Sequence, residues 1–171
     1  FAERLGTVPA KALPELLVEV LSRGLTSPEA LRPLVVTASK GVEPGTLRTM
    51  SEVIEEEAPA LAGKVYALSG PSFARELARG IATKVMLAGP DPETARQLQR
   101  IFNGGALRVE VTTDRRGVEL GGTLKNVLAI GCGMLDGMRA GHNTKAALLT
   151  EGMLEMGRLI RSRGGRAETM Y

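Results

Sequence analysis

The residues best suited to chemistry lie on one predicted helix, which runs from about residue 114 to residue 140. Positions spaced four apart on it set one lysine among small residues, in the series Gly117, Gly121, Lys125, Ala129, Gly133, Gly137 and Gly141. Residues four apart form one ridge of an α-helix, so Lys125 is the only functional side chain on this ridge. Because each interior glycine costs about 0.5–1 kcal/mol relative to alanine, the ridge indicates close approach by a helix, a backbone segment or a ligand.

Two interpretations of this ridge are open from the pattern alone. In the first, the helix is the floor of an active site and Lys125 is its proton donor. Glu119 and Asn126 would then bring a carboxylate and a carboxamide near the amine. In the second, the glycines serve tight helix packing and the lysine extends its amine into water.

The remaining reactive side chains predict no metal site. Cys132 is the only cysteine and lies within the glycine-rich helix, where a small buried residue is a better interpretation than a nucleophile. His142 is the only histidine, with no second histidine or cysteine nearby to build a zinc site. We therefore expect no metal.

Composition and charge favour a globular cytoplasmic protein with a small anionic substrate. Hydrophobic residues make up 43% and charged residues 24% of the chain, so it is neither disordered nor fibrous. No run of about 18 apolar residues is present, so we expect no membrane insertion. The net charge is +3, but aromatic residues are only 3% of the chain, which disfavours a base-stacking nucleic-acid surface.

The first two thirds of the chain alternate predicted helices and strands. Helices are expected over residues 11–21, 46–56, 73–79 and 91–102, and strands over residues 34–38, 64–68, 83–88 and 107–111, the last at a sheet edge. Thr46 and Asp91 are the expected caps of the second and fourth helices. This alternation predicts an α/β fold with a doubly wound sheet. Ligands bind beyond the carboxyl ends of such strands, where residues 39–41 and 69–72 fall.

The pattern becomes purely helical after residue 112. Asp114 is the expected cap of the helix that carries Lys125. Asn143 is the expected cap of a second helix, which Gly164 and Gly165 end. The sequence therefore predicts an α/β half joined to an all-helical half near residue 112.

Several segments occur in the order found in one enzyme family. They are residues 39–43 (SKGVE), 69–74 (SGPSFA), 119–127 (ELGGTLKNV), 136–137 (DG), 141–148 (GHNTKAAL) and 151–156 (EGMLEM). These segments resemble NAD(P)-dependent glycerol-3-phosphate dehydrogenase of the bacterial type, over roughly residues 9–171. The resemblance implies a partial Rossmann-like nucleotide-binding domain over residues 1–112. It also implies the start of an all-helical, 6-phosphogluconate dehydrogenase-like domain over residues 113–171.

The family resemblance also implies an activity. The family reduces dihydroxyacetone phosphate with NADH or NADPH to sn-glycerol 3-phosphate, which supplies glycerophospholipid synthesis. Its substrate contacts fall on Lys40, Gly70, Ser72, Lys125 and Asn126, and its cofactor contacts on Lys40 and Ala74. The resemblance also implies a cytoplasmic location, and a homodimer is possible.

The chemistry of the two lysines agrees with these roles. Reducing a carbonyl develops negative charge on its oxygen, and an ammonium at Lys125 would stabilise that charge and supply the proton. Partial burial and a second cation at Lys40 would lower the pKa of Lys125 toward the working pH. Simpler interpretations remain for two residues: Lys40 as a solvated loop lysine and Ser72 as a helix N-cap.

The chain departs from the family pattern at three places. The G-x-G-x-x-G turn that seats a pyrophosphate occurs nowhere in these residues. Residues 1–6 resemble the end of the helix that follows this turn, whereas residues 8–13 resemble a segment much further along the family sequence. We therefore expect a stitched remnant that lacks the nucleotide fingerprint and, beyond residue 171, the C-terminal substrate-binding segment. Glu151 stands where an arginine is common.

Three further questions stay open from the sequence. NADH and NADPH are both possible, because the residue that meets the cofactor's 2′ position follows a strand outside the matched segments. A related β-hydroxyacid or 6-phosphogluconate-type dehydrogenase is one alternative, although its lysine motif usually has paired asparagines where this chain has Asn126 and Val127. A non-catalytic helical assembly module, with the glycine ridge as a dimer interface, is the other.

Overall fold

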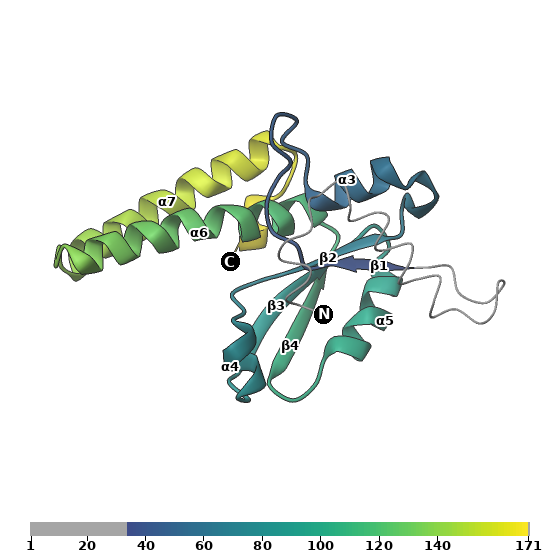
Figure 1. Cartoon of the computed structure of the whole chain (residues 1–171), viewed down its shortest axis with the longest axis horizontal. Helices are drawn as coiled ribbons and strands as arrows, with labels where there is room; N and C mark the ends of the chain where they lie inside the picture. Colours follow the sequence, from purple (N-terminus) through teal and green to yellow (C-terminus); the bar gives the residue numbers. More distant parts are fainter. Residues whose placement is uncertain (1–33, 171) are drawn as a thin grey trace.

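The computed structural model of the chain describes residues 34–170. The helix expected over residues 11–21 and the segments 1–6 and 8–13 lie outside the described residues. Within them, a small sheet with flanking helices carries a long hairpin of two helices that projects to one side (Figure 1). None of the described helices has the length and apolar character needed to span a membrane.

The sheet has four strands in the order β1-β2-β3-β4. Their bounds are Val35–Thr37, Val65–Ser69, Thr83–Ala88 and Leu107–Thr112, close to the predicted ranges. β1 pairs with β2 in parallel and β3 pairs with β4 in parallel. β4 lies at an edge, as predicted.

The pairing of β2 with β3 is antiparallel, so this one pairing differs from the two parallel pairings on either side of it. The cause lies in α4 (Ala74–Ala78), the only helix between these two strands. A crossover between parallel strands usually packs a helix against the sheet, but α4 is five residues long and buries none of them. The chain therefore turns back beside β2.

Two helices cover opposite faces of the sheet. α5 (Pro92–Phe102) packs its Leu98 in a core with Tyr66 of β2. α3 (Met50–Glu57), followed by the 3₁₀ turn η2 (Pro59–Leu61), packs its Ile54 in a second core with Val65. Because successive residues of a strand point to opposite faces, Val65 and Tyr66 show that the sheet is covered on both sides, as a doubly wound fold requires.

The predicted N-cap is confirmed for α5 and wrong for α3. Asp91 accepts a hydrogen bond of 2.7 Å from the backbone N–H of Thr94, as predicted. α3 starts three residues later than a cap at Thr46 would place it, and Thr49 is its N-cap. The backbone N–H of Thr49 donates to the Glu52 carboxylate at 2.9 Å. The reason is a turn in which Leu47 has a positive φ of 58°, which excludes a right-handed helix across that position.

The projecting hairpin consists of α6 (Arg115–Gly137) and α7 (His142–Ser162), followed by η3 (Ala167–Met170). Asp114 caps α6 by accepting from the backbone N–H of Gly117 at 3.0 Å, as predicted. α7 is capped by Gly141 instead of Asn143, because the tight turn between the helices requires a φ of 86° that glycine adopts readily.

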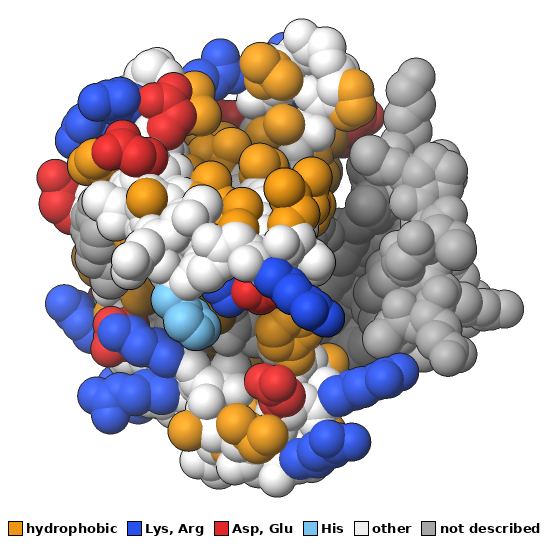
Figure 2. Space-filling model, turned by 90° about the vertical axis from the view of Figure 1, so that its left-hand side faces the viewer, with side chains coloured by type: hydrophobic (Ala, Val, Ile, Leu, Met, Phe, Trp, Pro, Cys, Tyr) orange, Lys and Arg blue, Asp and Glu red, His pale blue; other side chains and the backbone are white. Residues whose placement is uncertain are grey.

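Large apolar side chains remain exposed along this hairpin. Val127, Ile130, Met134 and Met138 each keep more than half of their surface accessible. The space-filling view from the hairpin side shows hydrophobic groups at the surface (Figure 2). The outer part of α6 is therefore not enclosed by the described residues.

Candidate active site

Two lysines from different parts of the chain converge on one backbone oxygen. The Nζ of Lys125, on α6, donates to the carbonyl oxygen of Gly70 at 2.6 Å. The Nζ of Lys40, in the loop after β1, donates to the same oxygen at 3.4 Å. Gly70 follows β2, so two parallel strands end at this point, where the sequence predicted a ligand site.

The shared oxygen is held in place by close packing of Gly70 against β3. A Cβ at position 70 would lie 2.9 Å from the backbone oxygen of Lys84 and 2.9 Å from the Cα of Val85. Both distances are shorter than real Cβ contacts allow. Glycine is therefore required for the loop to lie this close to β3 and to present its carbonyl to the two ammonium groups.

The pKa of Lys125 is lowered to about 8 from its ordinary value of 10.5. Burial is the largest cause, because a partly desolvated ammonium loses hydration that its neutral form does not need. The positive charge of Lys40 is the second cause. Both causes agree with the prediction from the sequence. They bring the pKa of this amine near neutral pH, where an acid–base group exchanges protons efficiently.

Lys125 lines a cavity of about 480 Å³ between the sheet and the helical hairpin. Gly70, Lys84 and Met86 line it from the sheet side, and Met153 and Met156 line it from α7. The lining is therefore mostly apolar, and the Lys84 and Lys125 side chains are its cationic groups. A cavity of this kind can hold a small anionic molecule with its polar groups toward the lysines.

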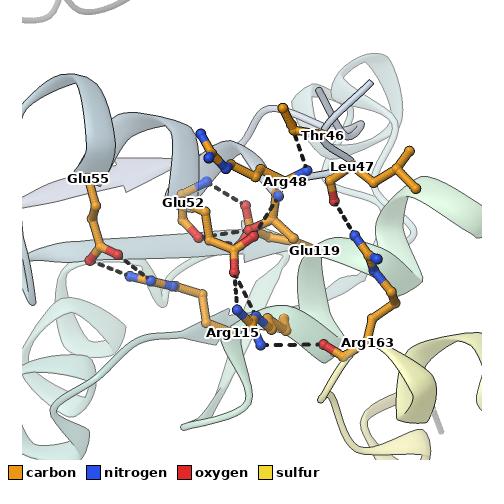
Figure 3. Close-up of polar contacts among 12 residues, drawn as sticks. Thr46, Leu47, Arg48, Glu52, Glu55, Arg115, Glu119 and Arg163 are labelled. Atoms are coloured by element: carbon orange, nitrogen blue, oxygen red, sulfur yellow. Dashed lines mark hydrogen bonds and ion pairs between the residues drawn. The ribbon is translucent and has the colours of Figure 1, made fainter. Parts of the chain in front are cut away.

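A second cavity, of about 620 Å³, lies between α3 and the hairpin but is a weaker candidate. Its charged side chains satisfy one another: Arg116 pairs with Glu52, and Arg48 pairs with Glu56. Arg163 donates to the backbone oxygen of Leu47 at 3.0 Å (Figure 3). Among the described residues, no unpartnered buried polar group faces this space, so the smaller cavity is the stronger candidate.

Glu119 does not join Lys125, contrary to the expectation of a carboxylate beside the amine. It is buried, with 4% of its surface exposed. Its carboxylate accepts hydrogen bonds from the backbone N–H of Ser51, at 2.9 Å, and from the Ser51 hydroxyl. Six residues of α-helix turn Glu119 well away from the direction of Lys125. Glu119 therefore attaches α6 to the start of α3.

A second contact between α6 and α3 supports the same attachment. The Arg115 guanidinium binds the Glu55 carboxylate with two hydrogen bonds, of 2.8 Å and 2.6 Å (Figure 3). Both side chains are about one fifth exposed, so water screens this pair less than a surface ion pair. α6 is thus attached to the α/β part through its N-terminal turns, ahead of Lys125.

The close contacts of α6 follow the predicted ridge only at its start, where a Cβ at Gly117 would overlap the Asp114 carboxylate. Gly133 and Gly137 have no heavy atom of the described residues within 4 Å of where a Cβ would stand. A Cβ at Gly122, in contrast, would overlap the hydroxyl of Ser69, and one at Gly131 would lie 3.0 Å from the Leu148 side chain. The helix does approach a strand and a second helix closely, but on a face rotated from the one expected.

The hydroxyl of Ser69 is itself unusual. It is buried at the end of β2 and has no hydrogen-bond partner among residues 34–170. Cys132 is half-buried, less than the sequence suggested, and lines the same cavity. Neither residue was among the predicted contacts, although Ser69 lies inside the segment 69–74 that carried the resemblance.

Four predicted site residues do not line the cavity: Lys40, Ser72, Ala74 and Asn126. Lys40 nevertheless contacts Gly70, which does line it. Ser72, which precedes α4, and Ala74, the first residue of α4, are both exposed. Asn126, one residue after Lys125, is exposed as well. Ser72 is also not the helix cap that a simpler interpretation predicted, because Phe73 occupies that position. The structure therefore brings together Lys40, Gly70 and Lys125. It leaves Ser72, Ala74 and Asn126 at the surface of the described residues.

Comparison with known proteins decides the family. The model of the NAD-dependent glycerol-3-phosphate dehydrogenase N-terminus matches residues 5–95, and that of the C-terminus matches residues 114–171. The chain belongs to this family. Membership decides against the β-hydroxyacid and 6-phosphogluconate families that the sequence left open.

Individual glycerol-3-phosphate dehydrogenases agree with this membership. The chain is 48% identical over 147 residues to the glycerol-3-phosphate dehydrogenase (NAD(P)+) of Oleidesulfovibrio alaskensis, over 86% of this chain and 44% of that protein. It is 49% identical over 136 residues to the enzyme of the same name from Geobacter metallireducens, over 79% of this chain and 41% of that protein. The chain thus spans less than half the length of these curated relatives.

Solved structures of glycerol-3-phosphate dehydrogenases show the same fold. The enzyme from Coxiella burnetii superposes with a TM-score of 0.74 at 35% identity, over 93% of this chain and 46% of that one. The enzyme from Saccharomyces cerevisiae gives a TM-score of 0.76 at 27% identity, over 96% of this chain and 48% of that one. The α/β part and the helical part both belong to the family architecture.

Proposed function

We propose that this chain carries the acid–base lysine of an enzyme that reduces dihydroxyacetone phosphate to sn-glycerol 3-phosphate with NADH or NADPH. The observation that carries the proposal is the convergence of Lys125 and Lys40 on the carbonyl oxygen of Gly70. Family membership supports it, because relatives nearly half identical to this chain have that activity as their name. The product would supply glycerophospholipid synthesis.

Lys125 is the proposed proton donor. As the substrate carbonyl is reduced, negative charge develops on its oxygen, and the Lys125 ammonium stabilises that charge and transfers its proton to it. A pKa of about 8 leaves most of these amines protonated at neutral pH, while making the proton easier to give up than that of an ordinary lysine. In the reverse direction the neutral amine would accept the proton from the substrate hydroxyl.

Lys40 is the proposed second cation of the site. It attracts the anionic substrate and, through its charge, helps to lower the pKa of Lys125. Gly70 would contribute backbone groups to substrate orientation. Ser72 and Asn126 are proposed substrate contacts at the rim, since both are exposed close in sequence to cavity residues.

The described residues fit one part of a nicotinamide cofactor. Lys40 lies beyond the carboxyl end of β1, the position where α/β sheets bind nucleotides. At Gly41 a Cβ would meet nothing within 4 Å, so the loop leaves open space beside Lys40. Ala74, small and exposed, offers a surface that a flat group can approach. When bound, the cofactor supplies the hydride; Lys40 and Ala74 would help to hold it.

The other features of the enzyme are proposed in the same way. We propose two domains that meet near residue 112, a cytoplasmic location and a homodimer. We also propose that the reaction needs no metal. The division near residue 112 is supported by the change from alternating strands and helices to helices alone.

The function is tested with the natural gene product that contains this chain. Purified protein is mixed with dihydroxyacetone phosphate and either NADH or NADPH, and oxidation of the nicotinamide is followed by its absorbance. We expect turnover with this substrate, and none above background when a β-hydroxyacid or 6-phosphogluconate is supplied with the oxidised cofactor. Turnover of either of those, with none of the triose phosphate, would contradict the proposal.

A further inference from the structure

A threonine connects the backbone segments that carry the two lysines. The backbone N–H of Gly41, the residue after Lys40, donates to the Thr123 hydroxyl at 3.0 Å. The same hydroxyl donates to the backbone oxygen of Glu119 at 2.9 Å. The direction of both bonds is fixed, because an N–H can only donate, a carbonyl can only accept, and a hydroxyl has a single proton to give.

We propose that Thr123 is a positioning residue that holds the Lys40 loop against α6 and so sets the separation of the Lys40 and Lys125 amines. The inference rests on the proposed function for its kinetic consequences. Thr123 lies two residues before Lys125 on the same helix, and its partner lies one residue after Lys40. The hydrogen bond is therefore a short bridge between the two backbones, next to both functional side chains.

Within the described part of the chain, this bond has no substitute. The other hydrogen bonds of residues 38–41 run from the Ser39 backbone N–H to the hydroxyl of Thr37, the last residue of β1, and from the Lys40 side chain to Gly70. Neither one contacts α6. Without the Thr123 hydroxyl, the loop would keep its internal turn but lose its hydrogen bond to the helix that carries Lys125.

The charge around Lys125 makes such a movement measurable. Lys40 faces the amine from the β1 loop, and its charge contributes to the lowered pKa of Lys125. Lys84 lines the cavity from β3 but is paired with Glu110 at 2.9 Å, and Cys132 lines it from α6. The lining residues from α7 and η3 are uncharged: Leu149, Met153, Met156 and Thr169. Of the side chains that face the Lys125 amine or line the cavity, only Lys40 belongs to the loop that Thr123 holds.

The test compares three variants of the natural gene product. Thr123→Val keeps the branched shape and removes the hydroxyl, whereas Thr123→Ser keeps the hydroxyl. Thr150→Val is the matched control, because the Thr150 hydroxyl makes the same kind of bond, of 3.0 Å to Ala146 four residues earlier, at an exposed site on α7. The readouts are the KM for dihydroxyacetone phosphate, the pH profile of kcat, and the NMR titration of isotope-labelled lysine side chains.

We expect Thr123→Val to raise KM by about 2- to 10-fold, the change that corresponds to one ordinary hydrogen bond. It should also move the titration of Lys125 upward, toward the ordinary lysine value. Thr123→Ser should restore both properties, and Thr150→Val should change neither. If Thr123→Val is too unstable to study, Thr123→Ala replaces it, and the comparison with Thr123→Ser is unchanged.

Two results would overturn the inference. One is a Thr123→Val protein with the parent's KM and the parent's Lys125 titration. The other is a Thr123→Ser protein that behaves like Thr123→Val, since retaining the hydroxyl would then not preserve the position of the loop. Because the NMR titration needs no turnover, it tests the bridge even if the parent does not reduce the triose phosphate, so the two proposals can fail separately.

Discussion

The Nζ of Lys125 lies 2.6 Å from the carbonyl oxygen of Gly70, which links the helical hairpin to the end of β2. Packing against β3 determines where this oxygen lies, because position 70 has no room for a side chain. The oxygen of a bound substrate would compete with a backbone acceptor for the same proton donor. Gly70 therefore holds the Lys125 ammonium at the place where we propose that it meets the substrate.

Gly70→Ala tests this relationship. The added Cβ would force the loop away from β3, and we expect a loss of about 1–3 kcal/mol in the free energy of unfolding, together with a large fall in kcat/KM. Denaturant unfolding and steady-state kinetics measure the two effects. Gly104→Ala is the matched control, since a Cβ there meets nothing within 4 Å. Equal stability and activity of the two variants would show that the Gly70 packing is unimportant.

The lowered pKa of Lys125 predicts the pH dependence of turnover. Reduction of the substrate requires the ammonium form, so its kcat should fall as pH rises through about 8. Oxidation of glycerol 3-phosphate requires the neutral amine, so its kcat should rise over the same interval. Lys40→Met removes a neighbouring positive charge and should shift both profiles to higher pH. Profiles that stay in place in Lys40→Met would refute the coupling of the two lysines.

Ser69 and Gly122 should be coupled in stability. Gly122→Ala would push a methyl group into the Ser69 hydroxyl, and we expect it to cost about 1–3 kcal/mol. Ser69→Ala removes that hydroxyl and leaves 3.3 Å between the added Cβ and the Ser69 Cβ, so the double variant should regain most of the loss. A double-mutant cycle by denaturant unfolding gives the coupling free energy. Strict additivity would mean that the two residues do not touch.

Local signals in the sequence predicted much of the fold. β3 and α5 have the expected bounds because alternating or amphipathic patterns and the Asp91 cap are properties of the segments themselves. The antiparallel pairing of β2 with β3 was missed, since it depends on α4 failing to pack against the sheet. The start of α3 was missed for a similar reason, because a positive φ at Leu47 has no clear signal in the sequence.

The nearness of the two lysines was predicted from the sequence, whereas their roles stay predictions and the contacts around them were mostly missed. Family motifs pointed to Lys40 and Lys125, and the carboxyl ends of parallel strands placed Lys40 and Gly70. The role of Glu119 could not be inferred, because its partner Ser51 lies 68 residues away in sequence. The Thr123 bridge was missed for the same reason: its partner Gly41 is 82 residues away. Contacts of this kind follow from the tertiary packing of α6, not from any local pattern.

The central claim is that Lys125 supplies the proton, and replacing it with methionine tests that claim most directly. Lys125→Met keeps an unbranched apolar side chain of similar length and removes the charge and the proton. The matched control is Lys64→Met, because Lys64 also donates to a backbone carbonyl, that of Ala60 at 2.9 Å, at an exposed site that does not line the cavity.

The measurement is kcat for reduction of dihydroxyacetone phosphate by the natural gene product, with cofactor affinity determined in parallel. We predict that Lys125→Met lowers kcat by roughly 10²–10⁴-fold, the usual contribution of general acid catalysis. Cofactor affinity should hardly change, and Lys64→Met should match the parent. A Lys125→Met enzyme that keeps the parent's kcat and loses only KM would contradict the account, because Lys125 would then bind substrate without donating the proton.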